Sequence, residues 1–163
     1  MRPIVTTILL LATGCAFLKP KPPPVTLRFH EQADAALPSG HYRIVNVPGT
    51  DRQIPIDPFA QLNEKDVREA RLVATPGGQG VQLYFDLHGA NSLTEMTTRL
   101  RGRYLVVFVD DRPVAAVLVE KPITNGEFLL EGDMTEAEDR ALVNNLNKLA
   151  GKRKDFGDTD FAP

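Results

Sequence analysis

Two continuous apolar runs joined by a short polar turn constrain this chain more than any other feature. The runs are residues 104–109 and 114–119, and the polar residues 110–113 separate them. A half-exposed strand alternates apolar and polar side chains, whereas a strand covered on both faces is apolar throughout. The pattern therefore predicts a hairpin whose strands are covered on both faces or lie centrally in a sheet. Asp110 and Asp111 are predicted to be turn residues rather than a catalytic acid pair.

Shorter strand patterns accompany this hairpin. The predicted strands are residues 25–31, 42–47, 53–56, 72–74 and 81–85. In the first of them, Val25, Leu27 and Phe29 alternate with polar residues and share one face. Pro55 has no N–H to donate, so its segment is predicted to be an edge strand or an irregular segment. The turn chemistry of residues 76–79 predicts a hairpin between the last two strands.

Three segments carry helix signals, and the predicted helices are residues 64–70, 89–100 and 135–149. Asn63 is a good N-cap for the first helix. Thr135 caps the last one, Glu138 completes a capping box, and Gly151 is predicted to end it. The apolar face of the second helix is predicted to hold Ala90, Leu93, Thr97 and Leu100, with Met96 at its edge. The predicted buried positions of the last helix are Ala141, Leu142, Leu146 and Leu149.

The N-terminal segment has the features of a targeting signal. Arg2 gives it a positive start, and residues 4–12 form an apolar run shorter than the roughly 20 residues that span a bilayer. The run ends in LATGC at residues 11–15, which resembles the lipobox of bacterial lipoproteins. We therefore expect cleavage before Cys15, acylation of its thiol and attachment of the chain to the lipid bilayer. The alternative is cleavage elsewhere, with Cys15 incidental.

A proline-rich segment follows the cysteine. Residues 17–24 read FLKPKPPP, a composition that excludes helix and favours extended polyproline II. Such a segment suits a semi-rigid spacer, and a ligand for a proline-binding partner is the alternative. The predicted organisation is a signal peptide at 1–14, a lipidated tether at 15–24, one domain at 25–151 and a flexible tail at 152–163.

Composition and motif content narrow the function classes. The chain has 163 residues, which suits one domain, and its formal net charge of −2 argues against a nucleic-acid partner. His30, His41 and His88 lack the spacing of metal ligands. The glycine-rich residues 77–80 lack the Lys-Ser/Thr of a phosphate loop, and no Gly-x-Ser-x-Gly elbow is present. We therefore expect no enzyme, no cofactor and no metal site.

Four motifs between residues 62 and 147 resemble, in order, the periplasmic head domain of SecD, a membrane protein of Sec-dependent protein export. They are Leu62-Asn63-Glu64-Lys65-Asp66-Val67 with Ala70; Gly89-Ala90 with Thr97; Leu105-Val106-Val107-Phe108-Val109-Asp110; and Ile123-Thr124-Asn125-Gly126 with the acidic run from Glu131 to Glu138. The resemblance implies an α+β fold with a ferredoxin-like arrangement, in which one antiparallel sheet carries the helices near 89–100 and 135–149 on one face. Asp111 stands where this family usually has glycine. The sequence predicts no membrane-spanning helix, so the resemblance does not extend to a proton-driven motor.

Together these features predict an envelope lipoprotein that faces the periplasm and binds a protein or peptide partner without catalysis. A link to Sec-dependent export follows from the resemblance alone, and Ala16 after the lipobox cysteine favours the outer membrane over the inner. The candidate contact residues are Thr124, Asn125 and Glu127, together with any exposed edge strand. Two alternatives stay open. Residues 121–127 could be a connector only, and the protein could be a structural or interaction lipoprotein that reuses the head fold with no export role.

The lipobox interpretation makes a direct prediction. Cys15→Ser should release the protein from membranes or leave its signal uncleaved, because the acyl chains are the expected anchor. Membrane fractionation and intact-mass measurement of the native protein check this. An unmodified Cys15 thiol on the native chain would contradict it.

Overall fold

The computed structural model describes residues 25–157 except 35, 37, 39 and 49–51, with side chains described up to residue 153. The predicted signal peptide, Cys15 and the proline tether lie outside the described residues, as do residues 158–163 of the predicted tail. The elements are β1 Leu27–Glu31, β2 Arg43–Asn46, β3 Gln53–Ile56, β4 Leu62–Asn63, the 3₁₀ turn η1 Glu64–Asp66, β5 Val67–Thr75, β6 Gly78–Phe85, α1 Leu87–Arg99, β7 Tyr104–Val109, β8 Arg112–Leu118, β9 Glu127–Leu130 and α2 Glu136–Gly157. Within the described residues, no helix combines the length and the hydropathy needed to cross a membrane.

The predicted central hairpin is β7–β8. Asp110 and Asp111 form its two-residue turn with φ angles of 50° and 63°, as a type I′ hairpin requires. On one face of β7, Leu105 and Val107 enter the main core, whereas Val106 and Phe108 on the other face pack under the β2–β3 hairpin. The prediction of a central strand covered on both faces is therefore confirmed for β7. It is wrong for β8, which is an edge strand with Leu118 exposed.

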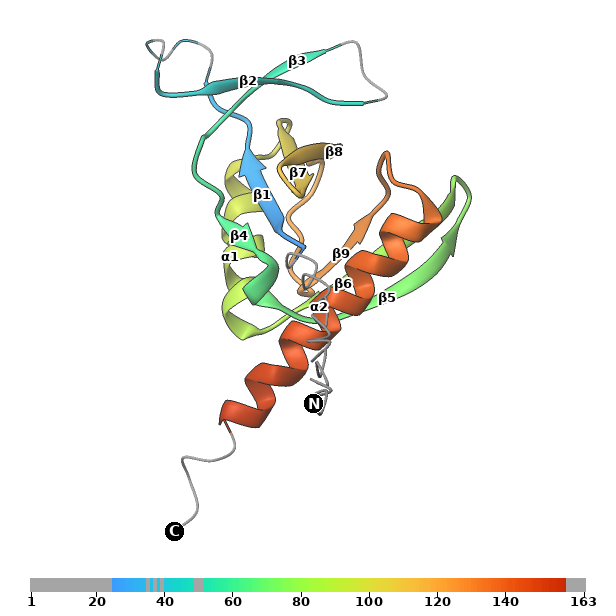
Figure 1. Ribbon diagram of the computed structural model, residues 1–163. Helices are drawn as coiled ribbons and strands as arrows, with labels where there is room; N and C mark the ends of the chain where they lie inside the picture. Colours follow the sequence, from blue (N-terminus) through green and yellow to red (C-terminus); the bar gives the residue numbers. More distant parts are fainter. Residues whose placement is uncertain (1–24, 35, 37, 39, 49–51, 158–163) are drawn as a thin grey trace, which may run out of the picture.

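The strands form three antiparallel sheets among the described residues, with orders β4-β1-β7-β8, β2-β3 and β5-β6-β9. Figure 1 shows the β2–β3 hairpin projecting above the two larger sheets. The α+β class with antiparallel strands and two main helices is confirmed, but the strands are divided where a single sheet was expected. The division falls between β8 and β9. The chain after β9 meets the start of β8, where Asp133 N–H donates to Val114 O at 2.8 Å and Arg112 donates to Asp133 O at 2.7 Å.

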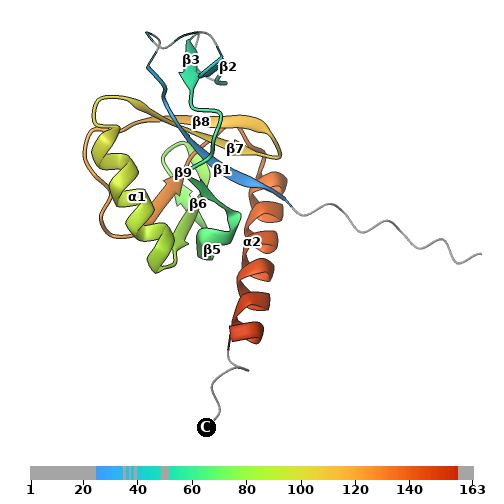
Figure 2. The same cartoon turned by 90° about the vertical axis from the view of Figure 1, so that its left-hand side faces the viewer.

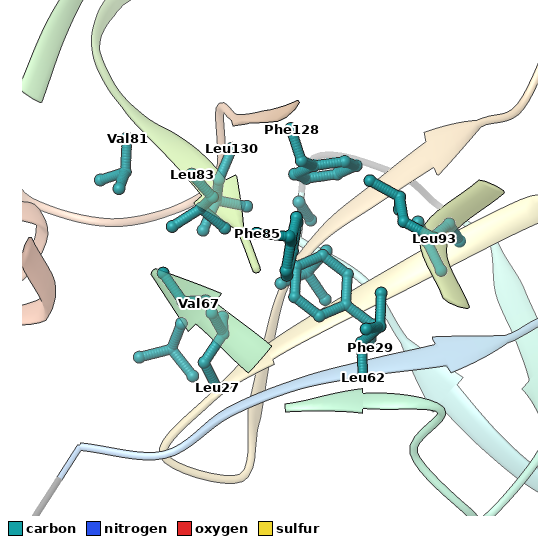
Figure 3. Close-up of a cluster of buried hydrophobic side chains, with 14 of the residues drawn as sticks. Leu27, Phe29, Leu62, Val67, Val81, Leu83, Phe85, Leu93, Phe128 and Leu130 are labelled. Carbon is teal, nitrogen blue, oxygen red and sulfur yellow. The ribbon is translucent and has the colours of Figure 1, made fainter. Parts of the chain in front are cut away.

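The main core lies between the inner faces of the two larger sheets (Figure 3). Phe29 of β1 meets Phe85 of β6 and Phe128 of β9 edge to face, with ring centroids 5.7 and 5.2 Å apart. Helices α1 and α2 add Leu93 and Leu146 to the same cluster, and Figure 2 shows the two helices on opposite sides of β6 and β9. Both helices thus contribute side chains to the core between the two larger sheets.

Local signals at the helix starts are confirmed, but two predicted boundaries are wrong. Asn63 does cap a turn, yet the helix predicted at 64–70 is only η1, because the chain continues as β5 and pairs with β6 from Val67 onward. Thr135 and Glu138 form the predicted capping box of α2. The helix does not end at Gly151 but continues to Gly157, into the segment predicted as a flexible tail.

Contacts with β5 explain both the position and the length of α2. Asn147 Oδ1 accepts the N–H of Ala70 at 2.8 Å, and its Nδ2 donates to Ala70 O at 2.9 Å. Two residues past Gly151, Arg153 donates to Val67 O and lies 3.4 Å from Asp86. These polar contacts fix the helix along the outer edge of β5.

The buried face of α2 also differs in part from the prediction. Leu142 and Leu146 are buried as predicted and Leu149 is partly buried, whereas Ala141 is exposed. Asp139 takes part in the buried face, with 3% of its surface exposed. Loss of hydration raises the pKa of the Asp139 carboxyl, the Gln79 amide opposes this shift, and the charges of Glu138 and Glu136 raise the pKa further.

Leu146→Ala should lower the free energy of unfolding by about 2–5 kcal/mol, because it leaves a cavity in the core. Ala141→Ser, at an exposed position of the same helix, should change this free energy by less than about 0.5 kcal/mol. Chemical denaturation of both variants measures the difference. A loss below about 0.5 kcal/mol for Leu146→Ala would place α2 outside the core.

Asp139→Asn should raise the free energy of unfolding at neutral pH and leave it nearly unchanged below about pH 4, where an unfolded Asp binds its proton. A folded pKa above the unfolded value means that stability falls as pH rises between the two, and Asn removes this loss. Denaturation across a pH series gives the result. A variant that is less stable than the parent at neutral pH would show that the ionised carboxylate supports the fold.

Candidate functional site

Helix α1 holds the predicted contact segment, residues 121–127, in a fixed shape. Thr97 Oγ1 accepts the N–H of Ile123 at 2.9 Å, and Thr94 Oγ1 donates to Ile123 O at 3.0 Å. Gly126 has a φ of 69°, and a Cβ at this position would lie 2.8 Å from Ala90 Cβ. The close approach to α1 therefore requires glycine and determines which side chains of the segment point outward.

The three predicted contact residues are all exposed, and the structure brings them together. Thr124, Asn125 and Glu127 line one groove of about 650 Å³ beside β9. Asn125 is also structural, because its Oδ1 accepts the N–H of Glu127 at 3.1 Å. The segment is thus both an ordered connector and one wall of a groove.

Residues that the sequence analysis did not select complete the groove. Gln82 of β6, Val117 of β8 and Leu129 of β9 line it, and Leu129 leaves 40% of its surface exposed. A signal for Leu129 was available in the sequence. In the run Phe128-Leu129-Leu130, alternate side chains of a strand must point to opposite faces, so the middle residue cannot share the core with its neighbours.

The groove combines apolar walls with hydrogen-bonding groups. Its ionisable lining residues are Lys121 and Glu127, and its apolar ones include Val117, Ile123 and Leu129. This lining offers surface and hydrogen bonds to another chain, with no base placed beside a nucleophile. Across the described residues, no three metal-ligating side chains come together.

The three histidines do not form a cluster. His30 packs in the fold, and the other two lie at the surface. His30 is buried in β1, its Nδ1 lies 2.8 Å from Asp57 O, and its ring meets Phe108 edge to face at 4.9 Å. Burial lowers the pKa of His30 below its ordinary value, and this bond to the Asp57 carbonyl opposes the shift. His41 and His88 are exposed.

A second groove, of about 510 Å³, lies on the other side of the contact between β8 and the chain after β9. Val114 of β8, Gln79 at the start of β6, and Glu131 are among its lining residues. The buried Gln79 amide lies near enough to the Asp139 carboxyl to oppose the rise of its pKa, but no acceptor among the described residues lies at hydrogen-bond distance from Gln79 Nε2. The two grooves therefore flank the point where the larger sheets meet.

Comparisons with known proteins agree with this fold. Residues 42–150 match the family model of the SecDF P1 head subdomain. The protein translocase subunit SecD of Acidaminococcus fermentans is 33% identical over 85 residues, which cover 50% of this chain and 20% of that protein. The chain thus spans about a fifth of the length of this curated relative.

Solved structures of SecDF share the fold. The structure of SecDF in its super-membrane-facing form superposes with a TM-score of 0.60 and 22% identity, covering 76% of this chain and 19% of that chain. The structure described as a membrane component SecDF that enhances protein export gives a TM-score of 0.58 and 20% identity, covering 76% and 62%. The resemblance to a SecD head is therefore confirmed, and the chain belongs to the SecDF P1 head subdomain family.

Proposed function

We propose that this chain is a binding module of the bacterial envelope, and that its head contacts a protein or peptide partner without catalysis. The observation that carries the proposal is the groove beside β9, where Thr124, Asn125 and Glu127 lie with exposed Leu129. Threonines of α1 hold one wall of this groove in place, so it is pre-formed. A pre-formed groove loses little conformational entropy when a partner binds.

The family supports polypeptides as the partner class. The curated relative is a protein translocase subunit, and one of the similar structures is described as enhancing protein export. This chain spans only about a fifth of that subunit, so the role of the whole subunit does not transfer to it directly. We therefore include a role in Sec-dependent export as part of the proposal. The second candidate is an envelope structural or interaction lipoprotein with no export role.

The proposal includes the place of action. Acylation of Cys15 would attach the chain to a lipid bilayer, and the proline-rich residues 17–24 would hold the head away from it. The head would then face the periplasm, where unfolded exported chains are accessible. Ala16 after the lipidated cysteine favours the outer membrane.

Site-specific photo-crosslinking in cells tests the groove. A photo-reactive amino acid at Thr124 should capture exported polypeptides or components of the Sec machinery, identified by mass spectrometry. The matched control places it at Asn144, an exposed position of α2 that does not line the groove. Capture of the same partners from both positions would contradict the proposal, and capture from Thr124 of envelope proteins unrelated to export would favour the second candidate.

Changing Thr124, Asn125 and Glu127 together to alanine should weaken capture, with the crosslinker moved to Leu129. Because Asn125 also supports the backbone, a double variant that keeps Asn125 separates loss of contact from loss of shape. Circular dichroism and the melting temperature verify the fold. Unchanged capture by a folded triple variant would exclude these three side chains as contacts, and turnover of an envelope substrate by the purified domain would exclude a non-catalytic role.

A further inference from the structure

The hydrogen-bond pattern of β9 shows which of its backbone groups face outward. Phe85 N–H donates to Gly126 O at 2.9 Å, which makes Phe85 and Gly126 a hydrogen-bonded pair. In an antiparallel ladder such pairs alternate with pairs whose N–H and C=O point away from each other. The register between β6 and β9 pairs Tyr84 with Glu127 and Gln82 with Leu129. Glu127 and Leu129 therefore direct their N–H and C=O groups away from β6.

The two outer edges of this three-stranded sheet are occupied differently. On β5, the Asn147 amide of α2 pairs with both backbone groups of Ala70, at 2.8 and 2.9 Å. On β9, the Asn125 amide takes only the N–H of Glu127, at 3.1 Å. In the part of the chain that the structure describes, β9 has no strand neighbour other than β6. The outer edge of β9 is thus open after the N–H of Glu127. That N–H is already bound by the side-chain amide of Asn125.

The open edge borders the groove described above. Glu127 and Leu129 both line this groove of about 650 Å³, and Val117 and Ile123 line it as well. Leu129 is 40% exposed. The groove therefore offers unpaired main-chain groups together with apolar side chains, which are the two components of strand addition.

We propose that the groove binds an extended polypeptide segment as an added strand on β9, paired with Glu127 C=O and with the N–H and C=O of Leu129. This inference rests on the proposed function and specifies how the partner is recognised. Asn125 marks the end of the open edge, because its amide fills the preceding position. Recognition through the main chain tolerates many sequences, which suits a partner class of unfolded chains. The same recognition excludes proline and N-methylated residues at those positions of the bound segment whose N–H donates to β9, because these residues have no N–H.

Leu129→Pro removes one outward N–H and leaves the bonds between β9 and β6 in place, since proline is tolerated where a strand N–H faces away from the ladder. Leu129→Ala keeps the N–H and removes the side chain, so it is the matched control. The probe is a fluorescein-labelled peptide of alternating Val and Thr residues with a Lys at each end, and fluorescence anisotropy gives its affinity. Leu129→Pro should weaken binding roughly tenfold, and Leu129→Ala should weaken it less.

A second measurement uses the unchanged protein and does not depend on how variants fold. N-methylation of the probe at successive residues should weaken binding at every second position, because only alternate residues of an added strand donate to β9. Equal affinity for all methylated probes would overturn strand addition while leaving polypeptide binding intact. No binding of this probe or of a reduced, carboxymethylated unfolded protein would overturn the proposed function as well. A dimer that forms without peptide and is lost in Leu129→Pro, seen by analytical ultracentrifugation, would assign the edge to a second copy.

Discussion

The burial of β7 on both faces is the constraint on which the rest of this structure depends. Leu105 and Val107 enter the main core, while Val106 and Phe108 need separate cover from the β2–β3 hairpin. Without that hairpin, β7 would expose a continuous apolar surface to water, at a cost of about 25 cal/mol per Å². The same burial places β8 at the outer edge of its sheet, because β1 occupies the other side of β7.

The separation of the two larger sheets creates the surface to which we assign the proposed binding. A continuous sheet would pair β8 with β9 and leave neither edge available. Instead the sheets meet at Val114 and Asp133 and diverge beyond this contact, so a groove forms beside β9. The opposite edge is protected by Asn147 and Arg153 of α2, which bind backbone groups of β5. One edge of the sheet is thus filled by the chain itself and the other is open to a partner.

Local sequence signals predicted most elements because their causes are local. The apolar run at β7, the turn at Asp110 and Asp111, and the capping box of Thr135 each depend on residues close in the chain. The candidate segment 121–127 was also selected correctly as an exposed, shaped loop, although its role as a binding surface remains a proposal. Pro122 and Gly126 predicted this loop.

Features that depend on distant contacts could not be read in this way. Gly151 is a typical residue for a helix end. The helix nevertheless continues to Gly157, and the Arg153 side chain donates a hydrogen bond to the carbonyl of Val67. The division into separate sheets depends on how β8 and β9 approach each other, which strand patterns do not encode. The sequence analysis did not predict a strand at residues 127–130, and the ladder with β6 shows that Leu129 faces away from the core that Phe128 and Leu130 enter.

Amide hydrogen exchange followed by NMR tests the central claim most directly. The N–H of Leu129 points away from β6, whereas those of Phe128 and Leu130 are on the bonded side of the ladder. On addition of the Val/Thr peptide, the account predicts that exchange at Leu129 slows, while exchange at Phe128 and Leu130 changes little. Binding of the peptide with no protection at Leu129 would contradict it.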